Sequence, residues 1–152
     1  MTTSHFQKLF EPTQIGSLKL RNRMIVPPMG TNFANPDGTV SERLKDYFAA
    51  RARGGFSLII TEGAAVSPDG RALPLELGIW DDSFIPGFRD LADEIHTEGA
   101  KIAVQLFYVG RETNSRLFGR PITLVAPSAI PCPLNREIPK ELSVEKIQEI
   151  VV

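Results

Sequence analysis

Three short apolar segments end in residues that suit the close approach of a ligand. The first, residues 24–30, reads Met-Ile-Val-Pro-Pro-Met-Gly, and the second, residues 56–63, ends in Thr-Glu-Gly. The third, residues 102–107, carries Gln105 in the run Ile-Ala-Val-Gln-Leu-Phe. Glycine at the end of the first two segments lets the backbone approach a ligand without a Cβ in the way. A primary amide both donates and accepts hydrogen bonds, so the third segment adds a recognition group.

The same segments have the length and composition of buried strands. Short continuous apolar runs with β-branched residues and no alternation favour strands that are covered on both faces, as in a parallel sheet. Ligands of parallel βα architectures gather at the carboxyl ends of the strands. Pro28 and Met29 could instead end a strand and fill the core, since methionine is a common gap-filler. Burying the amide of Gln105 without partners would be costly, which favours a ligand or a hydrogen-bond network there.

Apolar residues at helical spacing lie between and after these segments, as a parallel sheet requires. The expected N-caps of the three helices are Ser41, Ser83 and Ser143. Glycines at 54–55 and at 99 stand where the first two helices should end. The third pattern runs to Val152 with neither a stop signal nor another strand, which indicates an incomplete architecture.

Glycine and proline mark the connections. Residues 15–20 read as a tight turn between two short strands, a small hairpin that could plug the amino-terminal end of a barrel. Residues 121–139 form the longest proline-rich stretch, and long loops in compact domains are often lids or binding loops.

Composition excludes several classes of function. With 152 residues, 42% hydrophobic residues, 23% charged residues and a net charge of −1, the chain is an ordinary globular sequence. Nothing favours nucleic-acid binding, a membrane span or a signal peptide, so a cytoplasmic location is expected by default. The single cysteine, Cys132, excludes an intrachain disulfide and a cysteine-only metal site within these residues, and no metal ligands are predicted.

The chain is too short, and has too few strand candidates, to form a complete βα barrel. A βα barrel has eight strands and about 250 residues, whereas only three strand candidates occur here. We therefore expect residues 1–152 to be the amino-terminal portion of a single barrel domain, apparently truncated. Three parallel strands leave unpaired edges, through which self-association is possible.

Seven short motifs spread over nearly the whole chain carry a family resemblance. In chain order they are Leu9-Phe10-Glu11-Pro12 with Ile15-Gly16, Leu20-Arg21-Asn22-Arg23, Pro27-Pro28-Met29, Asp46-Tyr47 with Arg51-Ala52-Arg53-Gly54-Gly55, Thr61-Glu62-Gly63, Gln105-Leu106 with Gly110-Arg111, and Ala126-Pro127-Ser128-Ala129. Their order and spacing resemble the old yellow enzyme family of flavin-dependent ene-reductases. The run from Pro28 to Asn32 is most similar to the branch of NADH:flavin oxidoreductases, 2-enoate reductases and 2,4-dienoyl-CoA reductases.

The resemblance implies a (β/α)8 TIM barrel that binds FMN at the carboxyl ends of its strands. It implies hydride transfer from NAD(P)H through FMN to the activated C=C bond of an unsaturated carbonyl compound, acid or thioester. By the same resemblance, Pro28, Met29 and Gly30 line the flavin, Gly63 approaches it, and Gln105 reaches its pyrimidine edge. The family's catalytic side chains would fall beyond Val152, and an iron–sulfur cluster and FAD are expected only in a longer form.

Other polar residues have plainer interpretations. Glu62 could be a catalytic acid, but a hydrogen-bonded structural role is favoured. Arg111 could face substrate, although pairing within its loop is favoured. His96 lies on a helix pattern far from any strand end, and Tyr108 could supply a phenolic donor or simply pack. A non-catalytic truncated fragment that cannot hold FMN alone is the alternative to an enzyme.

Overall fold

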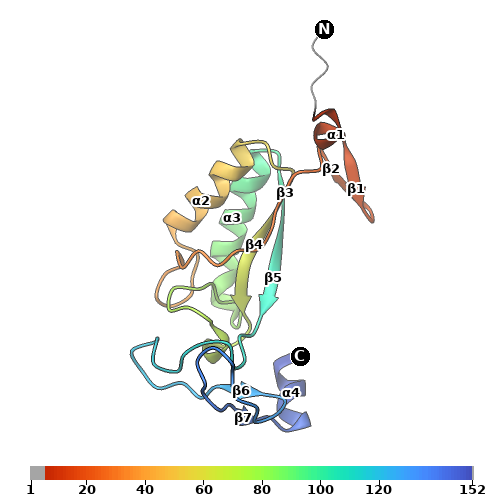
Figure 1. Cartoon of the computed structure of the whole chain (residues 1–152). Helices are drawn as coiled ribbons and strands as arrows, with labels where there is room; N and C mark the ends of the chain where they lie inside the picture. The colour runs from red at the N-terminus through yellow and green to blue at the C-terminus, as the bar shows by residue number, and fades with distance from the viewer. Residues whose placement is uncertain (1–5, 152) are drawn as a thin grey trace.

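A computed structural model of the chain describes residues 6–151 and begins with a helix and a hairpin. Helix α1 spans Gln7–Phe10, and strands β1 (Thr13–Ile15) and β2 (Leu18–Leu20) pair antiparallel. Gly16 has φ +57°, the left-handed backbone that a two-residue turn requires. The predicted hairpin is therefore confirmed, and Figure 1 shows it at the end of the sheet opposite the long loops.

A parallel three-stranded sheet forms the centre of the molecule. Its strands are β3 (Ile25–Val26), β4 (Leu58–Ala65) and β5 (Lys101–Phe107), in the order β3-β4-β5. The three predicted strands and their parallel arrangement are confirmed. β3 is shorter than the apolar segment that contains it, because Pro27 and Pro28 have no N–H to donate to a ladder.

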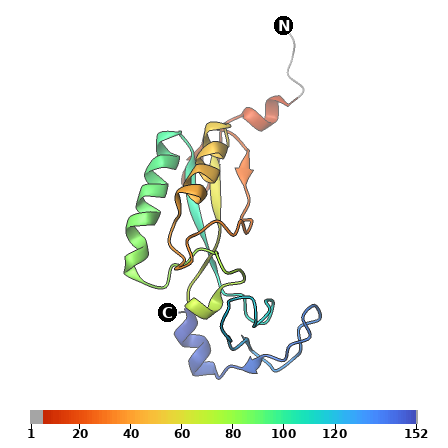
Figure 2. The same cartoon turned by 90° about the vertical axis from the view of Figure 1, so that its left-hand side faces the viewer.

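Two helices cover one face of this sheet. They are α2 (Glu42–Arg53) and α3 (Ile85–Thr97), which pack on β4, on β5 and on each other (Figures 1 and 2). The buried apolar residues that join helices and strands form one cluster: Val26, Ala34, Leu44, Phe48, Ala52, Ile59, Ala64, Leu77, Leu91, Ile95 and Ala100. The hydrophobic core therefore lies between the sheet and its helices.

For helices α2 and α3, three of the predicted boundary residues are confirmed and one prediction is wrong. The Ser41 hydroxyl accepts the N–H of Leu44 at 3.1 Å and so caps α2, as predicted. After α2 and α3, Gly55 and Gly99 adopt left-handed backbones with φ of +101° and +74°. The prediction that Ser83 caps α3 is wrong.

Asp81 takes the capping role that was assigned to Ser83. Its side chain accepts the N–H of Ser83 at 2.9 Å and caps the 3-10 turn η2 (Asp82–Phe84), which leads directly into α3. The turn places the start of α3 at Ile85, so its N-cap is Phe84, which makes no side-chain cap hydrogen bond.

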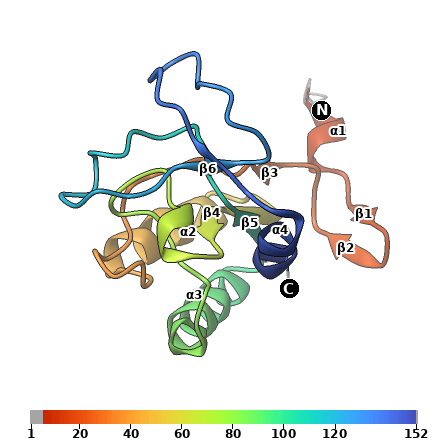
Figure 3. The same cartoon turned by 90° about the horizontal axis from the view of Figure 1, so that it is seen from below.

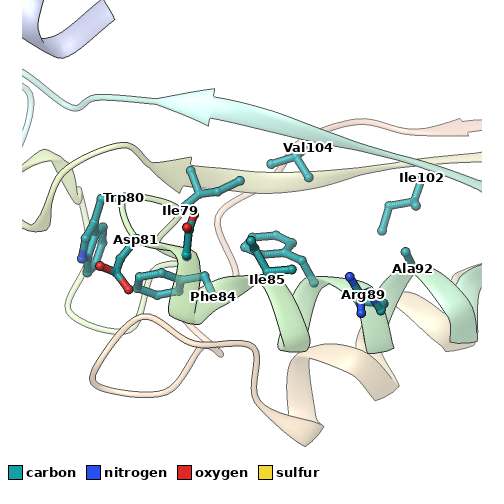
Figure 4. A pocket seen from close by; sticks show the side chains of 11 residues that line it. Ile79, Trp80, Asp81, Phe84, Ile85, Arg89, Ala92, Ile102 and Val104 are labelled. Atoms are coloured by element: carbon teal, nitrogen blue, oxygen red, sulfur yellow. The ribbon is translucent and has the colours of Figure 1, made fainter. Parts of the chain in front are cut away.

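The expectation that all strands are covered on both faces is wrong for β5. Ile102 and Val104 point toward α3 and line a groove of about 590 Å³ between strand and helix (Figure 4). Val104 is 37% exposed and Leu106 is 68% exposed. β5 is an edge strand, so nothing among residues 6–151 covers its outer side.

The segment after β5 is mostly loop. It contains the two-residue strands β6 (Val125–Ala126) and β7 (Lys140–Glu141), which pair in parallel and were not predicted. Helix α4 (Val144–Val151) follows, and the Ser143 hydroxyl accepts the N–H of Lys146 at 3.3 Å, consistent with the predicted cap. Seen from below, the loops between β5 and α4 lie on the side of the sheet opposite α3 (Figure 3). No helix in the described part of the chain is long and apolar enough to cross a membrane.

Candidate functional site at the carboxyl ends of the strands

Two of the predicted site residues are direct neighbours across the sheet. Gly63 of β4 and Gln105 of β5 are register partners in the parallel ladder. The ladder contains a bulge between Ile60 and Gly63, where two residues of β4 stand opposite one residue of β5. The second and third predicted segments therefore meet at the same edge of the sheet.

Gln105 lies on the face of β5 that is turned away from the helices. Val104 lines the groove beside α3. Because successive side chains of a strand point to opposite faces, Leu106 points to the same side as Val104, and Gln105 points to the other. The side chain is exposed, and no hydrogen bond from its amide to the protein occurs within residues 6–151. The premise that this amide is buried is wrong, because no element of residues 6–151 covers the face of β5 that is turned away from α3. Its donors and acceptor remain available to a ligand.

Glu62 connects the first predicted segment to the other two. Its side chain is fully buried, with 0% exposure, and Oε2 accepts the backbone N–H of Thr31 at 2.5 Å. Oε1 is also buried but has no hydrogen-bond partner in the described residues. Thr31 directly follows Gly30, and Glu62 directly precedes Gly63. A single hydrogen bond thus ties the segment that follows β3 to the middle of β4, next to Gly63.

The residues that directly follow β3 lie outside the hydrophobic core. Met29 is 51% exposed, so the interpretation that it fills the core is wrong. Pro28 is half-buried and Gly30 is exposed. A Cβ built on Gly30 would have Leu73 Cδ1 as its nearest neighbour, at 3.6 Å, which is an ordinary van der Waals contact. An exposed methionine beside an exposed glycine leaves an apolar surface at the strand end.

Gly63 has a packing role in addition to its place in the ladder. A Cβ at this position would lie 2.8 Å from Cγ of Phe107, closer than real Cβ atoms come. Gly70, in the 3-10 turn η1 (Pro68–Gly70), is restricted in the same way by the ring of Tyr108, at 3.0 Å. Tyr108 therefore has a packing contact, and burial raises the pKa of its phenol.

The loop that follows β3 is fastened to the loop that follows β4. Asn32 has a left-handed backbone, with φ +57°, and its Oδ1 accepts the N–H of Leu75 at 2.8 Å. The N–H of Ala34 donates to the carbonyl of Leu75 at 3.0 Å. In the second loop, Glu76 is 4% exposed and its Oε2 accepts the N–H of Ala72 at 2.5 Å. Burial raises the pKa of the Glu76 carboxyl, and the nearby Glu62 raises it further.

The remaining polar candidates lie outside this arrangement. Arg111 donates to the carbonyl of Ile130 at 2.8 Å, which agrees with pairing inside its loop. His96 is exposed near the end of α3. Cys132 is buried, with its Sγ 3.4 Å from a Glu112 carboxylate oxygen. Residues 6–151 contain no group of three or more potential metal ligands of the His, Cys, Asp or Glu types.

Sequence reasoning missed two groups that the structure connects to the site. The N–H of Thr31 and the carboxylate of Glu76 were not singled out, because a hydrogen bond between a backbone N–H and a distant or loop carboxylate leaves no spacing pattern. For Glu76 a weak signal exists, since a glutamate within Leu-Pro-Leu-Glu-Leu is flanked by apolar residues on both sides.

Parallel strands with helices on one face, and polar groups collected at the carboxyl ends, define the class: the chain is part of an α/β barrel. The model of the NADH:flavin oxidoreductase / NADH oxidase family matches residues 8–152. The chain therefore belongs to this family.

Individual relatives agree with this assignment. The chain is 44% identical over 149 residues to an NADH oxidase of Thermoanaerobacter brockii, covering 97% of this chain and 23% of that protein. It is 48% identical over 143 residues to a metal reductase of Desulforamulus reducens, covering 94% of this chain and 21% of that protein. A solved complex of 2-naphthoyl-CoA reductase with 2-naphthoyl-CoA superimposes with a TM-score of 0.87 at 28% identity, covering 94% of this chain and 24% of that one. The chain spans less than a quarter of the length of each of these three relatives.

Proposed function

We propose that residues 1–152 are the amino-terminal portion of an FMN-binding barrel domain of an ene-reductase type of oxidoreductase. The reaction is hydride transfer from NAD(P)H through FMN to the activated C=C bond of an α,β-unsaturated carbonyl compound, acid or thioester. The supporting observation is the register pair of Gly63 and Gln105 together with the bond from Thr31 to Glu62. These contacts gather three segments, far apart in sequence, at one edge of a parallel sheet.

The residues at this edge fit a flat ring with a polar rim. Gln105 has an exposed amide with no hydrogen bond to the described protein, and Met29 offers an exposed apolar surface. Gly30 has only an ordinary contact near its missing Cβ, so a ring can approach its backbone. FMN, when bound, supplies the acceptance and delivery of hydride.

The chain's own groups bind and orient in this proposal. The amide of Gln105 can donate to a ring carbonyl while accepting from the neighbouring ring N–H. Pro28, Met29 and Gly30 line one side of the ring, and the backbone at Gly63 approaches it. Catalytic side chains are proposed to lie outside this chain, so its part is recognition and positioning.

The names of two relatives support part of the proposed substrate and electron donor. The solved 2-naphthoyl-CoA reductase holds a CoA thioester, which supports a thioester of an unsaturated acid as one member of the proposed class. The name of the Thermoanaerobacter brockii relative, NADH oxidase, supports a reduced nicotinamide nucleotide as the electron donor.

A second candidate is a non-catalytic piece that cannot hold FMN alone. The observation that favours it is the uncovered side of β5, where Val104 and Leu106 are exposed. An edge strand with exposed apolar side chains can pair with another chain, so self-association accompanies this candidate.

One titration separates the two candidates. The purified 152-residue chain is titrated with FMN, while the visible flavin spectrum is followed and the species is sized by gel filtration. Saturable binding to a compact species supports the flavin site, and bleaching of the bound flavin by NADH or NADPH would extend it to hydride transfer. Absence of binding, or binding only to aggregates, favours the non-catalytic piece.

A further inference from the structure

The side chain of Glu62 is completely buried but only half satisfied. One carboxylate oxygen accepts the N–H of Thr31, whereas the other, Oε1, has no partner within residues 6–151. Burying a polar acceptor without a donor is unfavourable. A residue required only for the stability of β4 would be apolar at this position. The carboxyl group therefore needs an explanation beyond strand stability.

The contact of Glu62 joins β4 to the segment that follows β3, across a separation of 31 residues in the chain. Thr31 is bonded covalently to Gly30, and Glu62 to Gly63, which pairs with Gln105 across the ladder. A change in this one hydrogen bond would thus move residues 28–30 relative to both other segments of the site.

Other hydrogen bonds of the same loop lead elsewhere. Asn32 and Ala34 both bond to Leu75, in the loop that follows β4 and not in the strand itself. Among the described residues, Glu62 makes the only side-chain hydrogen bond from β4 to residues 27–34. Without it, the segment after β3 would be fastened to another loop but not to the strand that carries Gly63.

We propose that Glu62 is a positioning residue of the flavin site. Through the N–H of Thr31, it fixes the backbone of residues 28–30 relative to Gly63 and Gln105. This inference rests on the proposed FMN-binding function, since positioning has a purpose only if a ring binds at this edge. This role requires a side chain at position 62 that is long enough to bring an acceptor oxygen to the N–H of Thr31.

Glu76 provides a matched control. It is also a buried glutamate, and its Oε2 also accepts a backbone N–H at 2.5 Å, but the donor is Ala72 in its own loop. Shortening Glu76 therefore withdraws a comparable buried hydrogen bond while the bond from Thr31 to Glu62 stays in place.

The first test needs no flavin. Hydrogen exchange of the Thr31 amide is measured by NMR in the unmodified chain and in the variants Glu62→Asp, Glu62→Gln and Glu76→Asp. Asp retracts the acceptor by one methylene, whereas Gln keeps its length and an acceptor oxygen. Exchange should accelerate roughly 3- to 10-fold in Glu62→Asp, since a typical hydrogen bond is weakened, and should stay within about twofold in the other variants.

The second test measures FMN affinity in the same proteins. Glu62→Asp should weaken FMN binding by roughly 3- to 10-fold, and Glu62→Gln should restore it to within about twofold of the unmodified chain. Unchanged exchange at Thr31 in Glu62→Asp, or an equal loss of affinity in Glu76→Asp, overturns the inference.

The two tests separate this inference from the function on which it rests. If the unmodified chain does not bind FMN, the proposed function fails, and the exchange data still decide whether Glu62 fixes Thr31. If FMN binds equally well to Glu62→Asp, the function stands and the positioning role is rejected.

Discussion

Gly63 and Gln105 stand opposite each other on adjacent parallel strands, and the Gln105 side chain lies on the face of the sheet that is turned away from α3. The pair combines a residue without a side chain and a residue whose amide is unoccupied by the described protein. Because the Phe107 ring fills the place of a Cβ on Gly63, a ligand lying along this face would meet the Gln105 amide next to that ring. This pair leads to the first prediction.

Replacing Gln105 by leucine should weaken FMN binding. The variant removes both hydrogen bonds that the amide can offer to a ring edge, and we expect a loss of about 1–3 kcal/mol in binding free energy. Lys101→Leu, an exposed residue at the other end of β5, is the control and should leave the affinity unchanged. A flavin titration of both variants decides the matter, and unaltered affinity in Gln105→Leu would rule out the proposed role.

Adding a methyl group to Gly63 should destabilise the fold. The new Cβ would lie 2.8 Å from the Phe107 ring, and overpacking of this kind costs about 1–3 kcal/mol in the free energy of unfolding. Gly30→Ala should leave stability nearly unchanged, because its new Cβ would have only a contact of 3.6 Å. Urea unfolding of the two variants tests this contrast, which similar stabilities would contradict. In Gly30→Ala, a loss of FMN affinity at normal stability would support close approach of a ring.

Removing the hydroxyl of Ser41 should destabilise α2. Ser41→Ala loses the cap on the Leu44 N–H and the hydrogen bond that the hydroxyl donates to the Phe33 carbonyl, at a cost of about 1–2 kcal/mol. Ser83→Ala should have little effect, because its side chain caps no helix in the structure. Thermal unfolding monitored by circular dichroism would show the difference, and equal losses would restore Ser83 as a cap.

Stability should depend on pH through Glu76. Burial raises its pKa above the ordinary 4.5, Glu62 adds to the shift, and the backbone N–H of Ala72 and the charge of Arg71 oppose it. The folded state therefore holds this proton more tightly than the unfolded state. The stabilisation is fully present below the ordinary pKa and is lost as pH rises through the raised folded value.

Glu76→Gln isolates this effect, because its amide stays neutral throughout. Between pH 4 and pH 7, the free energy of unfolding should fall more in the unmodified chain than in the variant. Urea unfolding at both pH values provides the comparison. Parallel pH profiles would mean that Glu76 does not titrate differently in the two states.

Charged residues on β5 should suppress self-association. Val104→Lys and Leu106→Lys introduce charge along the exposed edge strand, which natural sheets use to prevent edge pairing. Leu134→Lys, at a hydrophobic side chain that is 87% exposed, is a control away from the three-stranded sheet. Sedimentation velocity should show less oligomer in the β5 variants only. An equal reduction in all three would point to a general effect of charge.

Local signals in the sequence predicted the elements well where a single residue type dictates the backbone. Gly16, Gly55 and Gly99 all adopt the left-handed conformation that their positions required, and the hairpin and both helix ends follow from them. The parallel sheet followed from continuous apolar runs. Each of these features depends on neighbours in the chain, which a sequence displays directly.

Features that depend on distant neighbours were harder to predict. The burial of Gln105 was expected from its apolar flanks, but burial of a side chain depends on what packs on its face of the sheet, and α2 and α3 pack on the other face. Strands β6 and β7 have two residues each and no pattern of their own. The link from Glu62 to Thr31 joins a side chain to a backbone group across the fold, so the residue type at position 31 gives no hint of it.

The bulge in β4 has a consequence for insertions and deletions. Because Thr61 and Glu62 share the space opposite one residue of β5, the strand contains one residue more than a regular ladder needs. Loss of residue 61 would leave Ile60 and Gly63 opposite Ala103 and Gln105, with Glu62 alone opposite Val104. A single lost codon at this point would therefore restore a regular ladder without moving either end of β4, whereas the loss of a residue elsewhere in the strand would shift its register by one residue.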